Sequence, residues 1–202
     1  MKFGRFATLF QPFMAAALVL MSAWPSRVLA QENHAHTMTT QHQEVTQDQQ
    51  TKASALLRIV RESTDRFHDV SVAESEGYAL QFGCVSGDSS GAMGLHYVNG
   101  DLVNKGALDA THPQIVIYEA TSDGRLRLIG ADYLLMQSVW DANHSSPPEL
   151  MGQLFHLFDS PNRFGLPAFY TLHVWAWKEN PNGAFVNWHP NVNCQNFSGQ
   201  AR

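Results

Sequence analysis

Apolar residues recur with a helical period from residue 53 onward. Leu56, Val60, Phe67 and Val70 fall near one face, and the opposite face carries arginines and acidic residues. This spacing predicts an amphipathic helix, because a helix turns once in about 3.6 residues.

A second helical segment is predicted over 69–80. Asp69 or Ser71 can cap its first turn, since a side-chain oxygen there accepts a free backbone N–H. Gly77 can end the segment, because glycine adopts the left-handed conformation found after many helices.

Beyond Gly77 the apolar period changes to two, which is typical of strands. Runs rich in β-branched and aromatic residues are separated by Gly, Pro, Asn or Asp, and they predict strands at 94–98, 114–120, 125–136, 168–177 and 184–189. The turn sequence TSDG at 121–124 predicts a hairpin over 114–136.

A short helix is predicted to interrupt the sheet within 145–158. Ser146 and Glu149 have the spacing of a capping box, and prolines stand at the first turn. Together these elements predict a single α+β domain over 53–202, with N-terminal amphipathic helices packed on a mostly antiparallel β-sheet.

The turn sequence NPNG at 180–183 predicts a hairpin between the last two strands, with Gly183 at positive φ. A loop of three or five residues places His173 and His189 on the same face of the sheet, as direct or diagonal neighbours. A four-residue loop would place them on opposite faces.

Two imidazoles on one face can bind one metal ion, and further ligands are available in neighbouring strands. His96 follows glycines that allow close backbone approach, and Glu119 ends an apolar strand where an unpaired carboxylate is costly to bury. Asp132 interrupts another apolar face in the same way. We therefore expect a metal site of His96, His173, His189 and Glu119, a mixed nitrogen and oxygen set suited to Zn, Cu, Fe or Ni.

The same residues also have a purely structural interpretation. A sheet histidine is often a core residue hydrogen-bonded to a backbone carbonyl, and tryptophan on a strand usually contributes packing. The remaining histidines of the folded part lie beside helix ends or turns, and we expect surface or capping roles for them: His68, His112, His144 and His156.

The first thirty residues have the features of a signal peptide. Lys2 and Arg5 precede the apolar run 14–24, and VLA at 28–30 is a pattern cut by signal peptidase. The run is too short for a membrane span, which needs roughly 20 residues, and no later segment qualifies. We expect an exported protein, in the periplasm or secreted.

Residues 31–52 contain almost no large apolar side chains and predict a disordered leader. Its His34, His36 and His42 can collect metal ions, as short histidine-rich tracts do, but we interpret the leader as a solvated tether. Without residues 1–30, the chain has a net charge of −8, because the 18 acidic residues remain while three of 13 basic ones are lost. This charge argues against a nucleic-acid partner, which requires a basic face.

Cys84 and Cys194 are the only cysteines. An even number of cysteines in an exported chain predicts a disulfide, and the alternative is a pair of thiolate metal ligands. The string GDSSG at 87–91 matches a nucleophile-elbow pattern, but it lacks the required strand–turn–helix context, so we interpret it as a flexible loop over the site.

The runs GAMGLHYVN, LHVWAWK and NWHPNVNC resemble sequences from a family of exported bacterial proteins of uncharacterised function. The resemblance spans about 70–198 and implies a shared domain and an exported location. It implies no particular reaction.

Three functions remain open on this evidence. The first is an exported protein that binds a transition metal or small ligand on its histidine-rich sheet face. The second is a metal-dependent enzyme acting on a small molecule through an open coordination position. The third is a structural or stress-related envelope protein without a metal.

Overall fold

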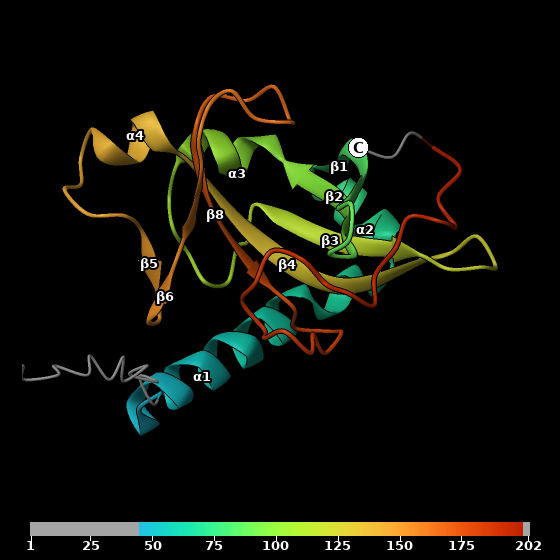
Figure 1. The fold of residues 1–202 in the computed structure, drawn as a ribbon, viewed down its shortest axis with the longest axis horizontal. Coiled ribbons are helices and arrows are strands. Elements are labelled where there is room, and N and C mark those ends of the chain that lie inside the picture. The colour runs from blue at the N-terminus through green and yellow to red at the C-terminus, as the bar shows by residue number, and fades with distance from the viewer. Residues whose placement is uncertain (1–44, 200–202) are drawn as a thin grey trace, which may run out of the picture. The chain divides into compact units, whose positions relative to one another are not determined.

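The computed structural model describes residues 45–199 (Figure 1). The signal peptide expected at 1–30 and the leader up to residue 44 lie outside this range. The helical elements are α1 (Gln47–Thr64), the 3-10 helix η1 (Asp65–His68), α2 (Val70–Ser75), α3 (Gly100–Lys105) and α4 (Gln137–Asp141). The strands are β1 (Tyr78–Ser86), β2 (Ala92–Asn99), β3 (Ile115–Ala120), β4 (Leu126–Met136), β5 (Glu149–Leu150), β6 (Gln153–Leu154), β7 (His156–Phe158) and β8 (Phe169–Val174).

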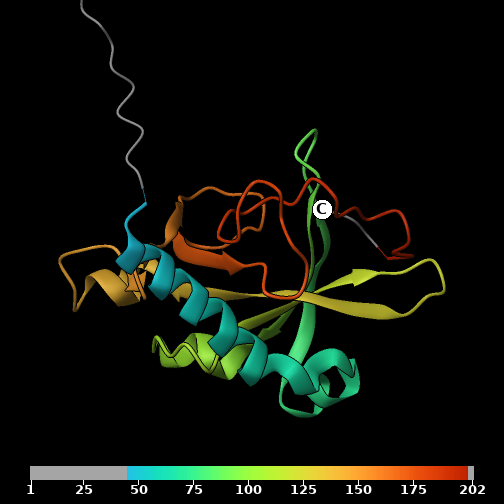
Figure 2. The same cartoon turned by 90° about the horizontal axis from the view of Figure 1, so that it is seen from below.

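Six strands of the described chain form one curled antiparallel sheet in the order β1-β2-β3-β4-β8-β7. Strands β5 and β6 form a separate two-stranded ribbon. The expected mixture of helices and antiparallel sheet is therefore confirmed. Figure 2 shows the tips of the β1–β2 and β3–β4 hairpins projecting from the sheet.

The two faces of the sheet have different partners. Tyr133 of β4 stands opposite Leu172 of β8, and both belong to a buried cluster that includes Leu56 and Val60 of α1. Residues one position away in each strand point to the other face, because side chains alternate along a strand. That second face is covered by the chain on either side of β8, and Trp175 is buried there.

Several local predictions are confirmed. The side chain of Asp69 caps α2 by accepting the backbone N–H of Ser71. Gly77 follows the helix with φ of 92°. The TSDG turn joins β3 to β4, where Gly124 has φ of 79°.

Helix α1 begins at Gln47, before the predicted start at residue 53. A complete capping box explains the earlier start: Thr46 accepts the backbone N–H of Gln49, and the Gln49 side chain accepts the backbone N–H of Thr46. Residues 47–52, which composition assigns to the leader, are therefore helical.

The predicted strand at 184–189 does not form. Strand β8 ends at Val174, and side chains bind the backbone carbonyls that a strand pair would use. The indole N–H of Trp175 donates to the Val186 carbonyl, and the Asn180 amide donates to the Trp188 carbonyl. The NPNG turn itself is confirmed, with Gly183 at φ of 117°.

The short helix predicted within 145–158 is also wrong. Met151 and Gly152 both have positive φ, at 51° and 80°, and join β5 to β6 as a tight hairpin. Two consecutive positive φ values are typical of a two-residue hairpin turn and end any helix. The capping-box spacing of Ser146 and Glu149 therefore produces no helix here.

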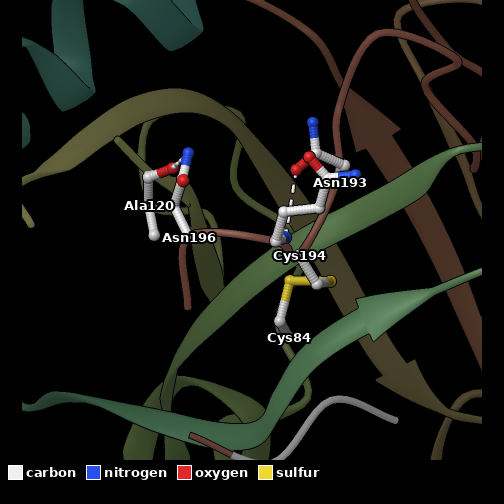
Figure 3. Close-up of a disulfide and its surroundings, with 6 residues drawn as sticks. Cys84, Ala120, Asn193, Cys194 and Asn196 are labelled. Carbon is white, nitrogen blue, oxygen red and sulfur yellow. Dashed lines mark hydrogen bonds between the residues drawn. A yellow bond between two sulfur atoms is a disulfide. The ribbon is translucent and has the colours of Figure 1, made fainter. Parts of the chain in front are cut away.

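A disulfide joins Cys84 of β1 to Cys194 near the C-terminus, across a sequence separation of 110 (Figure 3). The expected bridge is confirmed. Nearby, the Asn196 amide donates to the Ala120 carbonyl, which ties the same C-terminal segment to the end of β3 (Figure 3). No helix within 45–199 has the length and apolar character that crossing a membrane requires.

Candidate metal centre

Three strands bring His96, Asp132 and His173 to one face of the sheet. Asp132 of β4 stands directly opposite His173 of β8, and its partner in β3 is Ile115. His96 of β2 stands opposite Ile117, one step along the same face of β3. Within the described residues, these three form the one group of histidine and acidic side chains with metal-binding geometry, their ligand atoms all within 4.8 Å of one another.

The curl of the sheet makes this meeting possible. Strands β2 and β8 are separated by β3 and β4, which on a flat sheet would place their backbones roughly 14 Å apart. Yet Nε2 of His96 lies 3.3 Å from Nε2 of His173. The two rings therefore reach toward each other over the concave face.

Two glycines allow the strands to approach closely around the site. A Cβ atom on Gly94 would lie 2.6 Å from the Tyr118 carbonyl, and one on Gly130 would lie 2.6 Å from the Val174 carbonyl. The β3–β4 pairing also shifts between Ile117 and Tyr118, and such a bulge bends the strand that carries it. Gly94, two residues before His96, thus has the predicted role of allowing close backbone approach.

Asp132 is 2% exposed, and its carboxylate accepts hydrogen bonds from β8. Its Oδ1 accepts a hydrogen bond from Oγ1 of Thr171 at 2.5 Å and lies 3.8 Å from Nδ1 of His173. Burial raises the pKa of Asp132 to about 6, against the opposing effects of His96 and the Thr171 hydrogen bond. The carboxylate is thus predominantly ionised near neutral pH.

Both histidines of the cluster are fully desolvated. Burial lowers the pKa of His96 to about 4, and the neighbouring His173 contributes in the same direction. Burial lowers the pKa of His173 to about 3. Both rings are consequently neutral at pH 7, the protonation state in which imidazole can donate a lone pair to a metal.

The Nδ1 nitrogens of the two rings lack hydrogen-bond partners. Nδ1 of His96 and Nδ1 of His173 are buried and form no hydrogen bond of normal geometry. The Gly94 backbone and the Asn187 side chain act to raise the pKa of His96 and His173 respectively, but the lowering by burial is larger. A metal bound by both Nε2 atoms would require the proton of each neutral ring to lie on Nδ1.

The separation of the two Nε2 atoms matches that of two nitrogens bound to one ion. At metal–nitrogen distances of about 2.1 Å, a 3.3 Å separation corresponds to an angle of roughly 100° at the metal. This angle lies between those of octahedral and tetrahedral coordination. The residues present therefore fit a divalent transition metal.

The cluster borders a small cavity of about 30 Å³. Its polar lining is supplied by His96, Asp132, Thr171 and His173, and every other lining side chain is apolar. All three residues of the cluster therefore border this cavity.

His189 does not join the cluster. It is completely buried, and its Nδ1 accepts the backbone N–H of Asn191 at 3.1 Å. Its ring packs edge-on against Trp175, with centroids 4.9 Å apart, and its backbone pairs with Ala92. The strand at 184–189 that would align His189 with His173 does not form, and the structure places His189 outside the cluster.

Glu119 is also outside the cluster. Its carboxylate forms ion pairs with Arg127 and, at 2.5 Å, with Lys178. The buried carboxylate has cationic partners, as its burial requires, and these are two side chains.

The third member of the cluster, Asp132, is recognisable in the sequence as a charge within an apolar strand, whereas Thr171 gives no such signal. The remaining histidines of the described chain are exposed, as expected: His68, His112, His144 and His156. The leader histidines lie outside the described residues.

Comparison with known proteins gives no match: no family matches the chain, and neither does any curated protein or solved structure.

Proposed function

We propose that this protein is an exported transition-metal-binding protein whose ligands are His96, Asp132 and His173. The observation that carries the proposal is the 3.3 Å approach of two buried Nε2 atoms beside a buried carboxylate. An exported location is supported by the signal peptide expected at 1–30 and by the Cys84–Cys194 disulfide.

The energetics of the cluster support a bound cation. A buried carboxylate is costly in an apolar interior, and beside it the Nε2 atoms of His96 and His173 lie 3.3 Å apart. A divalent cation would compensate the carboxylate charge and use both Nε2 lone pairs. Two nitrogens and one oxygen form a mixed donor set suited to Zn, Cu, Fe or Ni.

A metal-dependent enzyme is the second candidate function, and the cavity favours it. Three protein ligands leave at least one coordination position open, as in catalytic metal sites, whereas structural zinc sites are usually closed by four protein ligands. The open side would face the cavity beside His96 and His173.

The proposal is tested by titrating metal-free protein with Zn(II) or Co(II) in a calorimeter. We expect one ion per chain for the wild type. Asp132→Asn keeps an oxygen to accept the Thr171 hydrogen bond but loses the charge, so we expect affinity to fall at least 10-fold. Glu119→Gln is the matched control, because it neutralises a buried carboxylate outside the cluster, and its metal affinity should be unchanged.

A folded wild-type protein that binds none of these ions would contradict the proposal and favour a structural role for the cluster. Equal affinity in the wild type and the Asp132→Asn variant would place the metal elsewhere.

A further inference from the structure

The cavity beside the cluster is lined by aromatic rings. Phe164 contacts the other three, with its ring centroid 5.4 Å from that of Phe82, 6.0 Å from that of Phe158 and 6.0 Å from that of Phe169. We call this space the phenylalanine chamber. Its apolar lining contrasts with the polar cluster of His96, Asp132 and His173 at one end.

The phenylalanine chamber is too small for an ordinary organic substrate. Its volume is about 30 Å³, whereas a single water needs roughly 10–15 Å³ on this measure and ligand pockets usually occupy hundreds. A molecule of two or three non-hydrogen atoms fills it. The apolar walls offer such a molecule no hydrogen bonds, so an ion would lose its hydration without compensation from them.

A larger pocket adjoins the chamber and opens a route to it. This outer pocket is lined by Gln81, Val103, Asn104 and Met136 among others, and it shares four lining side chains with the chamber: Phe82, Val98, Leu134 and Leu166. These shared side chains lie between the two spaces and line both of them.

Phe82 has an unusual backbone for a bulky residue in this partition. Its φ is 65°, in the left-handed region, and the β1–β2 pairing shifts between Gln81 and Cys84 so that Phe82 and Gly83 are unpaired. Bulges re-aim side chains, and strained backbones in folded proteins are concentrated at functional sites. Here the bulge directs a half-buried ring into the partition.

We infer that the phenylalanine chamber binds an uncharged diatomic molecule, of the class of dioxygen or nitric oxide, at the open position of the metal, and that this molecule enters past Phe82. The inference rests on the proposed function, because the metal supplies the bond that holds the ligand.

The experiment uses the full protein loaded with Fe(II) under anaerobic conditions, with iron content measured first. Nitric oxide is the small probe, detected by electron paramagnetic resonance, and tert-butyl isocyanide is the bulky probe, detected by optical absorption. We expect the wild type to form the nitrosyl adduct and to exclude the isocyanide. Phe82→Gly should admit both probes, because it joins the chamber to the outer pocket.

Glycine is the appropriate replacement because φ of 65° favours it, so the variant should remain folded. Met151→Gly is the matched control: Met151 also has positive φ, at 51°, but it packs in the α1 cluster away from the chamber. This control should exclude the isocyanide as the wild type does.

Each failure has a distinct meaning. Absence of bound iron and of any other metal would overturn the proposed function and this inference with it. If iron is retained but no nitrosyl adduct forms, or if the wild type forms an isocyanide adduct, the inference that the chamber binds only a diatomic ligand is overturned and the proposed function stands. If Phe82→Gly excludes the isocyanide as the wild type does, the inference that ligands enter past Phe82 is overturned.

Discussion

Asp132 and His173 face each other across the β4–β8 pair, with Oδ1 of Asp132 3.8 Å from Nδ1 of His173. That distance is too long for a hydrogen bond. The same oxygen instead accepts the hydroxyl of Thr171, two residues before His173 on the same face. Thr171 therefore orients the Asp132 carboxylate, whereas Asp132 and His173 form no hydrogen bond with each other.

Thr171→Val should weaken metal binding without removing a ligand. Valine keeps the shape of threonine but loses the donor to Asp132, and losing such a supporting hydrogen bond typically costs 10- to 100-fold in metal affinity. Calorimetric titration of metal-free protein measures this change. Thr64→Val is the control: Thr64 is also buried and hydrogen-bonded, but to Val60 and Trp177, so it should lower stability and leave the metal affinity unchanged. Unaltered metal affinity in Thr171→Val would show that the Asp132 carboxylate does not need the Thr171 hydrogen bond to bind the metal.

Gly130→Ala should separate the strands that form the site. Its Cβ would lie 2.6 Å from the Val174 carbonyl, a contact that backbone must move to relieve. We expect a loss of roughly 1–3 kcal/mol in the free energy of unfolding, as for overpacked cores, together with weaker metal binding. Gly100→Ala, with open space around its Cβ, should be neutral or stabilising. Equal urea midpoints for the two variants would contradict the tight β4–β8 approach.

The disulfide should be a major source of stability. Removing both sulfurs with the double variant Cys84→Ala and Cys194→Ala frees a loop with a separation of 110 residues. Chain entropy alone predicts a loss of roughly 4–5 kcal/mol, and measured losses for native bridges are typically about 2–5 kcal/mol. Urea unfolding with and without reductant measures it. A native protein that reacts with a thiol reagent before reduction would contradict the bridge.

Alkaline pH should unfold the protein through buried tyrosines. Burial raises the pKa of Tyr78 from 10.0 to about 12, and burial also raises the pKa of Tyr118. Both hydroxyls donate to backbone carbonyls, of Pro113 and Phe67 respectively. Because the folded-state pKa is raised, the stabilisation is complete below pH 10 and is lost as the pH rises from 10 toward 12.

For Tyr78 this loss amounts to roughly 2–3 kcal/mol. Tyrosinate absorbance and circular dichroism should therefore change together in an alkaline titration. Ionisation of these tyrosines near pH 10 in a protein that keeps its folded spectrum would contradict their burial.

Local features of the sequence predict the elements whose signals are local. The TSDG turn, the Asp69 cap and the alternating strands around 114–136 specify themselves through nearby residues, and the structure contains each of them. The GDSSG segment likewise forms the loop between β1 and β2.

The errors arise where side chains compete with the backbone or where curvature matters. The strand expected at 184–189 is replaced by indole and amide hydrogen bonds to its carbonyls, and no periodicity reveals that competition. His96 and Asp132 meet because the sheet curls, and alternation predicts which face a residue occupies but not how far that face bends. Asp132 could therefore be recognised as unusual without being assigned to the site.

The most direct test of the metal centre is X-ray absorption spectroscopy of the zinc-loaded protein. The account predicts two imidazole nitrogens at about 2.0–2.1 Å together with oxygen ligands, and one imidazole after His173→Ala. His189→Gln should leave the count at two, because that ring lies outside the cluster. A spectrum with no imidazole contribution, or one that loses an imidazole in His189→Gln and none in His173→Ala, would contradict the assignment of His96, Asp132 and His173 as the ligands.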